Sequence, residues 1–541
     1  MHPVLPYLLA LTLSVPAAAP QHEHSGAPPE RLGTVHFATS CRPDVQPAFD
    51  RAVALLHSFW FSQAREAFSG VLQKDPGCAI ANWGIALAHF GNPFGVNRSP
   101  EALGSARTAV TQGLAGKPGS ARERDYLSAA AELFRDFETR DHAARVLAYE
   151  QAMARVAKAY PQDAEATIFH ALALAQTAPP TDKSYKNQLA AGAVLEPLFA
   201  KQPDHPGLAH YIIHAYDVPA LAPRALEAAR RYAQIAPSAP HALHMPSHTF
   251  TRVGAWDESI EANLRSAEAA HRERAVSDEM HAMDYLVYAY LQTARDAAAR
   301  EVVTALEQLL AGLPQEGAGG LTAAEAGGYF AAAAIRARYT LERSAWADAA
   351  ALDVHPGAAP NVPAMTHFAR ALGAARTGAL DAARGDVVKM GELHAQLVKN
   401  NDAYWAEQID IQRTVANAWI AFAAGNAAEA ERLLRTAADR EDATEKSAVT
   451  PGPLVPARES LGDLLMELKR PAEALPMYEK NLAKEPNRLK SVYGAARAAD
   501  LAADRTKAHD YFTQLAAICA RADTPNRPEL RAALLYLQKK G

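Results

Sequence analysis

A repeat with a period of 34 residues constrains the fold of this chain more than any other feature. Near the C-terminus, Ala474 and Tyr478 are followed by Ala508 and Phe512, and both pairs are displaced by 34 positions (508 − 474 and 512 − 478). This period is typical of a helical hairpin in which a small residue lies where two helices cross and an aromatic residue fills the gap beside it. Because one hairpin cannot bury this face alone, the chain is predicted to stack hairpins on one another.

Helical patterning extends over most of the chain. Apolar residues recur at a spacing of three or four from about Val45 to the end, without a convincing series of alternating strands. Prolines interrupt the pattern at KDPGC, AYPQD, KQPDHPG, IAPSAP and KEPNR. In FWFSQAREAFSGVLQKDP the repeat positions are occupied by Ala64, Phe68, Val71 and Pro76. The sequence therefore predicts an all-α fold, a solenoid or superhelix of helical hairpins.

With these residues the chain resembles the tetratricopeptide repeat (TPR) family, most clearly over residues 45–90, 203–270 and 455–518. The phrases LLHSFWFSQAREAF, HALHMPSHTFTRVGAWDESIEAN and GPLVPARESLGDLLMELKRPAEAL are similar to those of exported bacterial TPR proteins of uncharacterised role. The resemblance implies a TPR-like α-solenoid. It implies little about activity, because such a solenoid is a scaffold on which unrelated sites occur.

The N-terminus has the pattern of a secretory signal peptide. An apolar run from Val4 to Val15 precedes the small residues Ala17 to Ala19, although no Lys or Arg precedes the run. The alternatives are a mis-assigned start and a frayed N-terminal helix. The first interpretation predicts a signal peptide over residues 1–19 and a secreted or periplasmic protein. No later segment has about 18 uninterrupted apolar residues, so no membrane span is expected.

The remaining boundaries follow from the breaks in the repeat pattern. Residues 20–44 are expected to form a partly irregular leader, and residues 45–442 a TPR-like solenoid with a His-rich concave groove. The Pro-rich and Thr-rich stretch at 443–456 is predicted to be a loop, with a lid over the groove as an alternative. Residues 457–541 are expected to form C-terminal TPR hairpins.

Charge and motifs exclude several classes of function. Lys and Arg number 55 against 60 Asp and Glu, a formal net charge of −5, so the chain has no basic surplus for nucleic acid. The sequence has no GxxxxGK[ST] loop, no GxGxxG after a strand, no HExxH and no GxSxG. Nucleotide-dependent and serine-hydrolase chemistry therefore have no support.

The chain has three cysteines, Cys41, Cys78 and Cys519. In an exported protein Cys41 and Cys78 can form a disulfide that links the first repeat to its leader and leaves Cys519 single. Three buried free thiols are the alternative.

Histidines at equivalent repeat positions are the strongest functional signal. His210 and His214 lie one helical turn apart, and a shift of 34 residues leads to His244 and His248. The family resemblance implies that these positions line the concave groove, together with those of His241 and Asp217. In His281 and Asp284 the next repeat has two further candidates, whereas the repeat positions of His57, His89 and His170 do not match.

Two pairs of histidines on adjacent helices can converge on one metal ion. Residues four apart on a helix lie about 6 Å apart at Cβ, and packed helices lie about 8–10 Å apart. Imidazole binds zinc and also suits copper and iron, so Zn, Cu or Fe is expected. The predicted metal site comprises His210, His214, His244 and His248, with Asp217, His241, His281 and Asp284 as further ligands or their supports.

Three functions remain open. The groove can hold a transition metal that hydrolyses or oxidises a small molecule, or it can carry a metal without turnover. Alternatively, the chain is a metal-free TPR scaffold that binds a peptide or protein partner in the groove. In that case the histidines are packed polar groups that hydrogen-bond to carbonyls or to residues such as Tyr211 and Tyr216.

Overall fold

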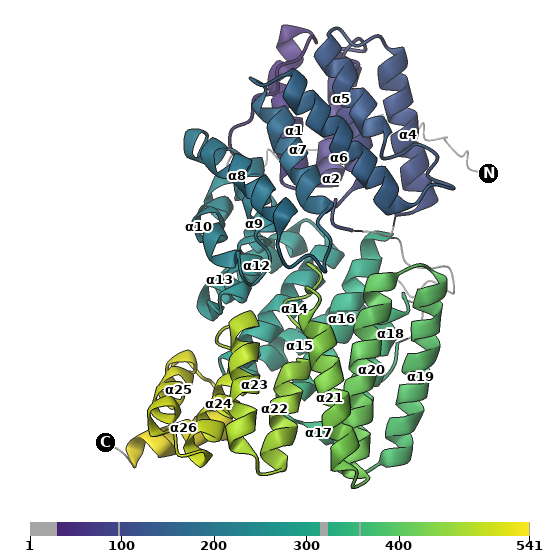
Figure 1. The fold of residues 1–541 in the computed structure, drawn as a ribbon. Coiled ribbons are helices and arrows are strands. Elements are labelled where there is room, and N and C mark those ends of the chain that lie inside the picture. The colour runs from purple at the N-terminus through teal and green to yellow at the C-terminus, as the bar shows by residue number, and fades with distance from the viewer. Residues whose placement is uncertain (1–29, 96–97, 314–322, 356–358, 540–541) are drawn as a thin grey trace, which may run out of the picture.

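The computed structural model describes residues 30–95, 98–313, 323–355 and 359–539. Within these ranges the protein is all-α and contains no strand. Successive helices pack on one another along the chain and form an α-solenoid of helical hairpins, which confirms the predicted fold class (Figure 1). The predicted signal peptide at 1–19 lies outside the described residues. None of the described helices is long and apolar enough to cross a membrane.

The N-terminal part of the solenoid is a stack of helices around a core of aromatic residues. Its helices are η1 (Pro43–Val45), α1 (Gln46–His57), α2 (Phe61–Lys74), α3 (Ala81–Phe90), α4 (Pro100–Ala115), α5 (Ala121–Ala131), α6 (His142–Ala159) and α7 (Ala164–Gln176). Gly84 of α3 lies against the ring of Phe68, where an added Cβ would come within 2.2 Å of Cε2. This close approach is the small-and-aromatic packing that the repeat pattern predicts.

A disulfide links the start of the solenoid to the second hairpin. Cys41 and Cys78 are bonded, with their Cα atoms 4.7 Å apart. Cys519 is free and buried. Of the two alternatives that the sequence left open, the structure has the disulfide.

The central helices carry the candidate site residues. They are α8 (Lys186–Lys201), α9 (Pro206–Ala215), η2 (Ala222–Ala225), α10 (Leu226–Ile235), α11 (Pro240–His244), α12 (Pro246–Arg252), α13 (Trp256–Arg272) and α14 (Val276–Gln292). α10 packs on α9 and α12, and α13 packs on α11, α12 and α14. Residues from α9 to α14 therefore share one interior.

The second half of the solenoid continues the same packing. Its helices are α15 (Asp296–Ala311), α16 (Ala323–Leu341), α17 (Trp346–Ala350), α18 (Asn361–Thr377), α19 (Leu380–Lys399), α20 (Ala403–Ala423), α21 (Ala427–Asp442), α22 (Ala457–Glu467), α23 (Pro471–Lys484), α24 (Leu489–Leu501), α25 (Arg505–Ile518) and α26 (Pro528–Gln538). Tyr478 of α23 is 1% exposed and packs between Gly462 and Gly494. The repeat residues Ala474, Ala508 and Phe512 are buried as well.

The C-terminal hairpins fold back onto the central helices. Gly254 has a φ of +69°, and a Cβ there would lie 2.3 Å from the carbonyl oxygen of Pro486. Asn487 donates to the carbonyl of Gly254 at 3.0 Å and accepts, through its own carbonyl, from the indole of Trp256 at 2.9 Å. This contact brings segments more than 200 residues apart against one another where α12 ends and α13 begins.

Candidate metal centre

Helix α9 places two histidines one turn apart. Pro206 occupies its first turn, and the N-cap residue His205 accepts a hydrogen bond from the backbone of Leu208 at 3.3 Å. His210 is buried and His214 is half-buried, and their ring centroids lie 4.7 Å apart. Both rings therefore face the interior that α9 shares with the following repeat.

The next repeat supplies three histidines from two short helices. Pro246 follows Met245 and interrupts the helix that starts at Pro240, because proline has no N–H for the backbone ladder. His241 and His244 lie on α11, and His248 lies on α12. Met245 between them keeps helical dihedral angles, so His244 and His248 remain one turn apart, with their Nε2 atoms 3.0 Å apart.

The structure brings six of the predicted residues together as two groups of three histidines. Trio A consists of His210, His214 and His241, and trio B consists of His244, His248 and His281. Within each trio, one ring nitrogen from each residue lies within 4.8 Å of the others. The sequence predicted a single set built on two histidine pairs. The structure divides those pairs between two adjacent trios, and each trio gains a third member.

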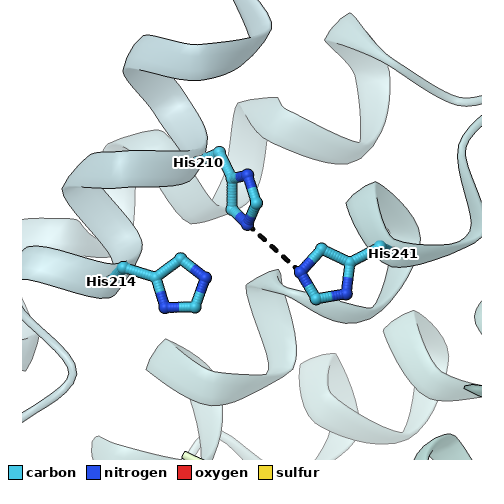
Figure 2. A group of neighbouring side chains, drawn as sticks. All are labelled: His210, His214 and His241. Carbon is cyan, nitrogen blue, oxygen red and sulfur yellow. Dashed lines mark hydrogen bonds between the residues drawn. The ribbon is translucent and has the colours of Figure 1, made fainter. Parts of the chain in front are cut away.

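In trio A, the rings of His210 and His241 face one another (Figure 2). The Nδ1–H of His210 donates to the backbone carbonyl of His57 at 2.6 Å, which leaves a lone pair on Nε2. The Nε2 atom lies 3.2 Å from Nε2 of His241. A buried Nε2 of His214 has no hydrogen-bond partner. The carbonyl of His57 therefore fixes the tautomer that a metal ligand requires.

Aromatic rings enclose trio A. Phe94 stacks on His214 with ring centroids 4.2 Å apart, and the ring of Phe59 meets that of His210 edge to face with centroids 4.3 Å apart. Tyr232 stacks on the other side of His210 at 5.1 Å. These rings limit the access of water to the nitrogens.

In trio B, hydrogen bonds fix the Nδ1 atoms of His244 and His248 as donors. His244 donates from Nδ1 to Oδ1 of Asn263 at 2.7 Å, and Nδ2 of Asn263 donates to the carbonyl of Ser259, so the amide cannot be reversed. His248 donates from Nδ1 to the carboxylate of Asp217 at 3.1 Å. The two Nε2 lone pairs therefore face each other across 3.0 Å.

Burial keeps all six imidazoles in the neutral form. Desolvation is the largest cause of a lowered pKa in each of them. Neighbouring histidines add to it in five of them, and Lys446 and Arg252 add to it in His248. For His248, Asp217 opposes the effect and the pKa is still lowered. The neutral imidazole is the form that binds metal ions.

The two predicted carboxylates do not belong to either trio. Asp217 accepts from His248 and, through Oδ1, from Nε of Arg252 at 2.9 Å. Asp284 forms a buried ion pair with Arg338 at 2.8 Å. Asp217 thus supports a histidine of trio B from behind, whereas Asp284 is engaged by α16.

The segment between α21 and α22, residues 443–456, contacts the residues around trio B through Ala448, Thr450 and Lys446, and is called the strap below; Figure 1 shows the chain between these two helices. Tyr285, which stacks on His248 with ring centroids 5.0 Å apart, donates to the carbonyl of Ala448 at 3.3 Å. Lys446 of the strap extends inward, and its Nζ lies 3.6 Å from Oδ1 of Asp217. Burial and the nearby Arg252 lower the pKa of Lys446 to about 8.

Sequence reasoning did not identify Lys446. The strap has no helical period, so the repeat register assigns it no position. The one feature of the sequence that points to Lys446 is that it is the single lysine of a segment considered as a lid.

A third group of potential ligands lies behind trio A. His57 and His205 both bond to Glu165, through Nε2 at 2.9 and 2.8 Å respectively. Nδ1 of His57 bonds to the hydroxyl of Tyr211 at 2.9 Å, and Nδ1 of His205 caps α9. Since their ring nitrogens are all occupied by protein partners, this group supports trio A rather than forming another metal site.

No protein-family model and no curated protein sequence matches the chain. Among solved structures, the human IFIT1 dimer with m7Gppp-AAAA aligns at a TM-score of 0.36 and 11% identity, covering 82% of this chain and 90% of that one. Naa15/Naa10 bound to HypK-THB aligns at a TM-score of 0.24 and 12% identity, covering 91% and 74%. Similarity this low assigns neither an activity nor a partner to the chain.

Proposed function

We propose that this protein binds about two transition-metal ions, one on each histidine trio, and uses them to act on a small molecule. The observation that supports the proposal best is the pair of opposed lone pairs on His244 and His248. Two uncharged acceptors 3.0 Å apart repel one another unless a cation lies between them, and burial disfavours the imidazolium that a shared proton would create.

The distance between the nitrogens also fits metal coordination. Two nitrogens at about 2.0–2.1 Å from one ion, at ligand angles of about 90–110°, lie about 2.8–3.4 Å apart. Both Nε2 pairs, at 3.0 and 3.2 Å, fall in this range. Imidazole-only sets suit zinc and copper, and also iron.

Turnover is favoured over simple carriage because each trio offers three protein ligands. Structural sites close the coordination sphere with four ligands, whereas three ligands leave a position for water, oxygen or substrate. A metal in such a position lowers the pKa of water or polarises a bound group. The reaction class that follows is metal-assisted hydrolysis or oxidation.

The proposal includes export from the cytoplasm. A disulfide between Cys41 and Cys78 persists most readily in an oxidising compartment, and the apolar N-terminal run has the pattern of a signal peptide. Secretion or a periplasmic location accounts for both features.

Elemental analysis of protein purified without a polyhistidine tag tests the proposal. We expect about two zinc, copper or iron atoms per chain, and almost none in the double variant H210Q/H244Q, with helical content retained by circular dichroism. A wild-type chain that remains metal-free after incubation with each of these ions would identify the protein as a metal-free scaffold. Unfolding of the double variant in the apo state would show that the histidines are structural.

A further inference from the structure

The strap is fixed over trio B from both sides. Glu445 accepts from Lys183 at 2.6 Å and from the hydroxyl of Tyr185 at 2.9 Å. On the other side, Arg338 donates to Thr450 at 2.5 Å and to the carbonyl of Gly452 at 2.7 Å. Lys446 lies between these attachments, so its backbone is held in place over the histidines.

The ammonium of Lys446 is buried without a hydrogen-bond partner. The side chain is 6% exposed, and Nζ is inaccessible and makes no hydrogen bond. Asp217, at 3.6 Å, is its nearest ionic partner. The carboxylate of Asp217 is already engaged by Arg252 and His248. Glu485 also acts electrostatically on Lys446 and Arg252, but no acid forms a hydrogen bond with Nζ of Lys446. A buried charge is costly unless a counter-ion and hydrogen bonds compensate it.

The metal ligands do not supply the missing negative charge. The six histidines are neutral, and within the described part of the chain Asp217 is the one carboxylate that hydrogen-bonds to any of them. Asp284, the other predicted acid, forms an ion pair with Arg338. Divalent ions on trio B would add positive charge beside Lys446, which acts electrostatically on His244, His248 and His281.

We propose that Lys446 and trio B together form a binding position for a small anionic ligand, such as a carboxylate or another oxyanion. The anion occupies the open position on the trio B ion and accepts a hydrogen bond from Nζ of Lys446. This inference rests on the proposed metal function and specifies its substrate class: the small molecule is anionic, or it becomes anionic when bound.

Azide binding to the copper(II)-loaded full chain tests the anion position. Azide gives a charge-transfer absorption on copper(II), and acetate then measures the affinity of a carboxylate by displacement. The H214A background restricts copper to trio B. Replacement of Lys446 by Met should weaken azide and acetate by about tenfold or more, the loss expected for one charge-assisted hydrogen bond. Lys446→Arg should recover part of that affinity.

Lys389→Met is the matched control, because it removes a lysine charge whose exposed ion pair with Glu392 lies within α19, away from the strap. It should leave the azide affinity close to that of the parent. Equal azide affinity in K446M and its parent, with one copper bound in each, would overturn the anion position and leave the metal function intact. A chain that binds no copper, zinc or iron overturns the metal function itself, and the two failures are thus distinguished by metal content.

Discussion

Asp217 accepts a hydrogen bond from Nδ1 of His248 at 3.1 Å, so a carboxylate lies directly behind a histidine whose other nitrogen faces trio B. Such partners orient the ring and raise its basicity, and their loss typically weakens metal binding by about 10–100-fold. Replacement of Asp217 by Asn should therefore weaken the trio B ion by about tenfold or more and leave the trio A ion unchanged. Competition titration against a chelator of known affinity measures both.

Asp381→Asn is the control for this prediction, because Asp381 is fully exposed and pairs only with Arg384 of the same helix. D381N should change the affinity for neither the trio A ion nor the trio B ion. Equal weakening at both trios in D217N would indicate a general loss of structure instead of a local effect on His248.

Removal of one histidine from each trio should separate the two ions. His214 and His281 are both half-buried, so alanine at either position disturbs packing less than it would at the buried His210 or His244. We expect H214A and H281A each to lower the metal content from about two ions to about one, and the double variant to bind almost none. The exposed His509 provides the control, since H509A should retain both ions. Loss of both ions from either single variant would mean that the trios form one inseparable site.

The repeat register identified most of the centre but not its grouping. A shift of 34 residues correctly placed His244 and His248 on the same face as His210 and His214, because equivalent positions of stacked hairpins face one interior. It placed His241 in one set with His210, but it did not predict that His210, His214 and His241 would form a trio separate from His244 and His248. That contact depends on where α11 starts relative to α9, a tertiary detail that the repeat period does not contain.

The supporting groups were harder to predict than the histidines. Asn263 and the carbonyl of His57 set the tautomers of His244 and His210, yet neither stands out in the sequence. The partner of Asp284, Arg338, lies 54 residues further along the chain. Lys446 is on a segment without periodicity. These contacts arise because distant segments fold onto α12 to α14, and local pattern carries no information about them.

The disulfide should stabilise the N-terminal part of the solenoid. Cys41 and Cys78 are 37 residues apart. Closure of a loop of that length lowers the conformational entropy of the unfolded chain, which raises its free energy by about 4 kcal/mol. We expect the C41S/C78S variant to lose up to about this amount in the free energy of unfolding, measured with urea under non-reducing conditions. Cys519→Ala, at the free buried thiol, leaves the disulfide intact and serves as the comparison. Equal stability of C41S/C78S and wild type would contradict the expectation.

The apo protein should lose stability below about pH 6.5, the usual histidine pKa. The six site histidines have lowered pKa values in the folded state because they are buried, so the unfolded chain binds protons first as the pH falls. Their contribution is therefore present above about pH 6.5 and is lost at lower pH, by up to about 1.4 kcal/mol per pH unit for each histidine.

Urea unfolding of the apo protein at pH 7.5 and pH 5.5 measures this dependence. The H214A/H281A variant lacks two of the six groups and should show a shallower slope. A slope identical to that of the wild type would mean that these two histidines are already protonated in the folded chain.

Arg338 should control whether the strap stays closed. It forms a buried ion pair with Asp284 and donates to Thr450 and Gly452 of the strap. Removal of one partner of a buried pair typically costs about 3–5 kcal/mol, so R338M should be strongly destabilised. Thr450→Val is the milder variant, since it leaves the Asp284–Arg338 ion pair intact and removes only the two hydrogen bonds of the Thr450 hydroxyl, from Arg338 and to the carbonyl of Gly452. In T450V we expect faster proteolytic cleavage within residues 443–456 at unchanged global stability.

The control Arg432→Met affects an exposed ion pair within α21 and should change neither the cleavage rate nor the stability. Cleavage rates equal to wild type in both R338M and T450V would show that the strap is held by contacts other than those of Arg338.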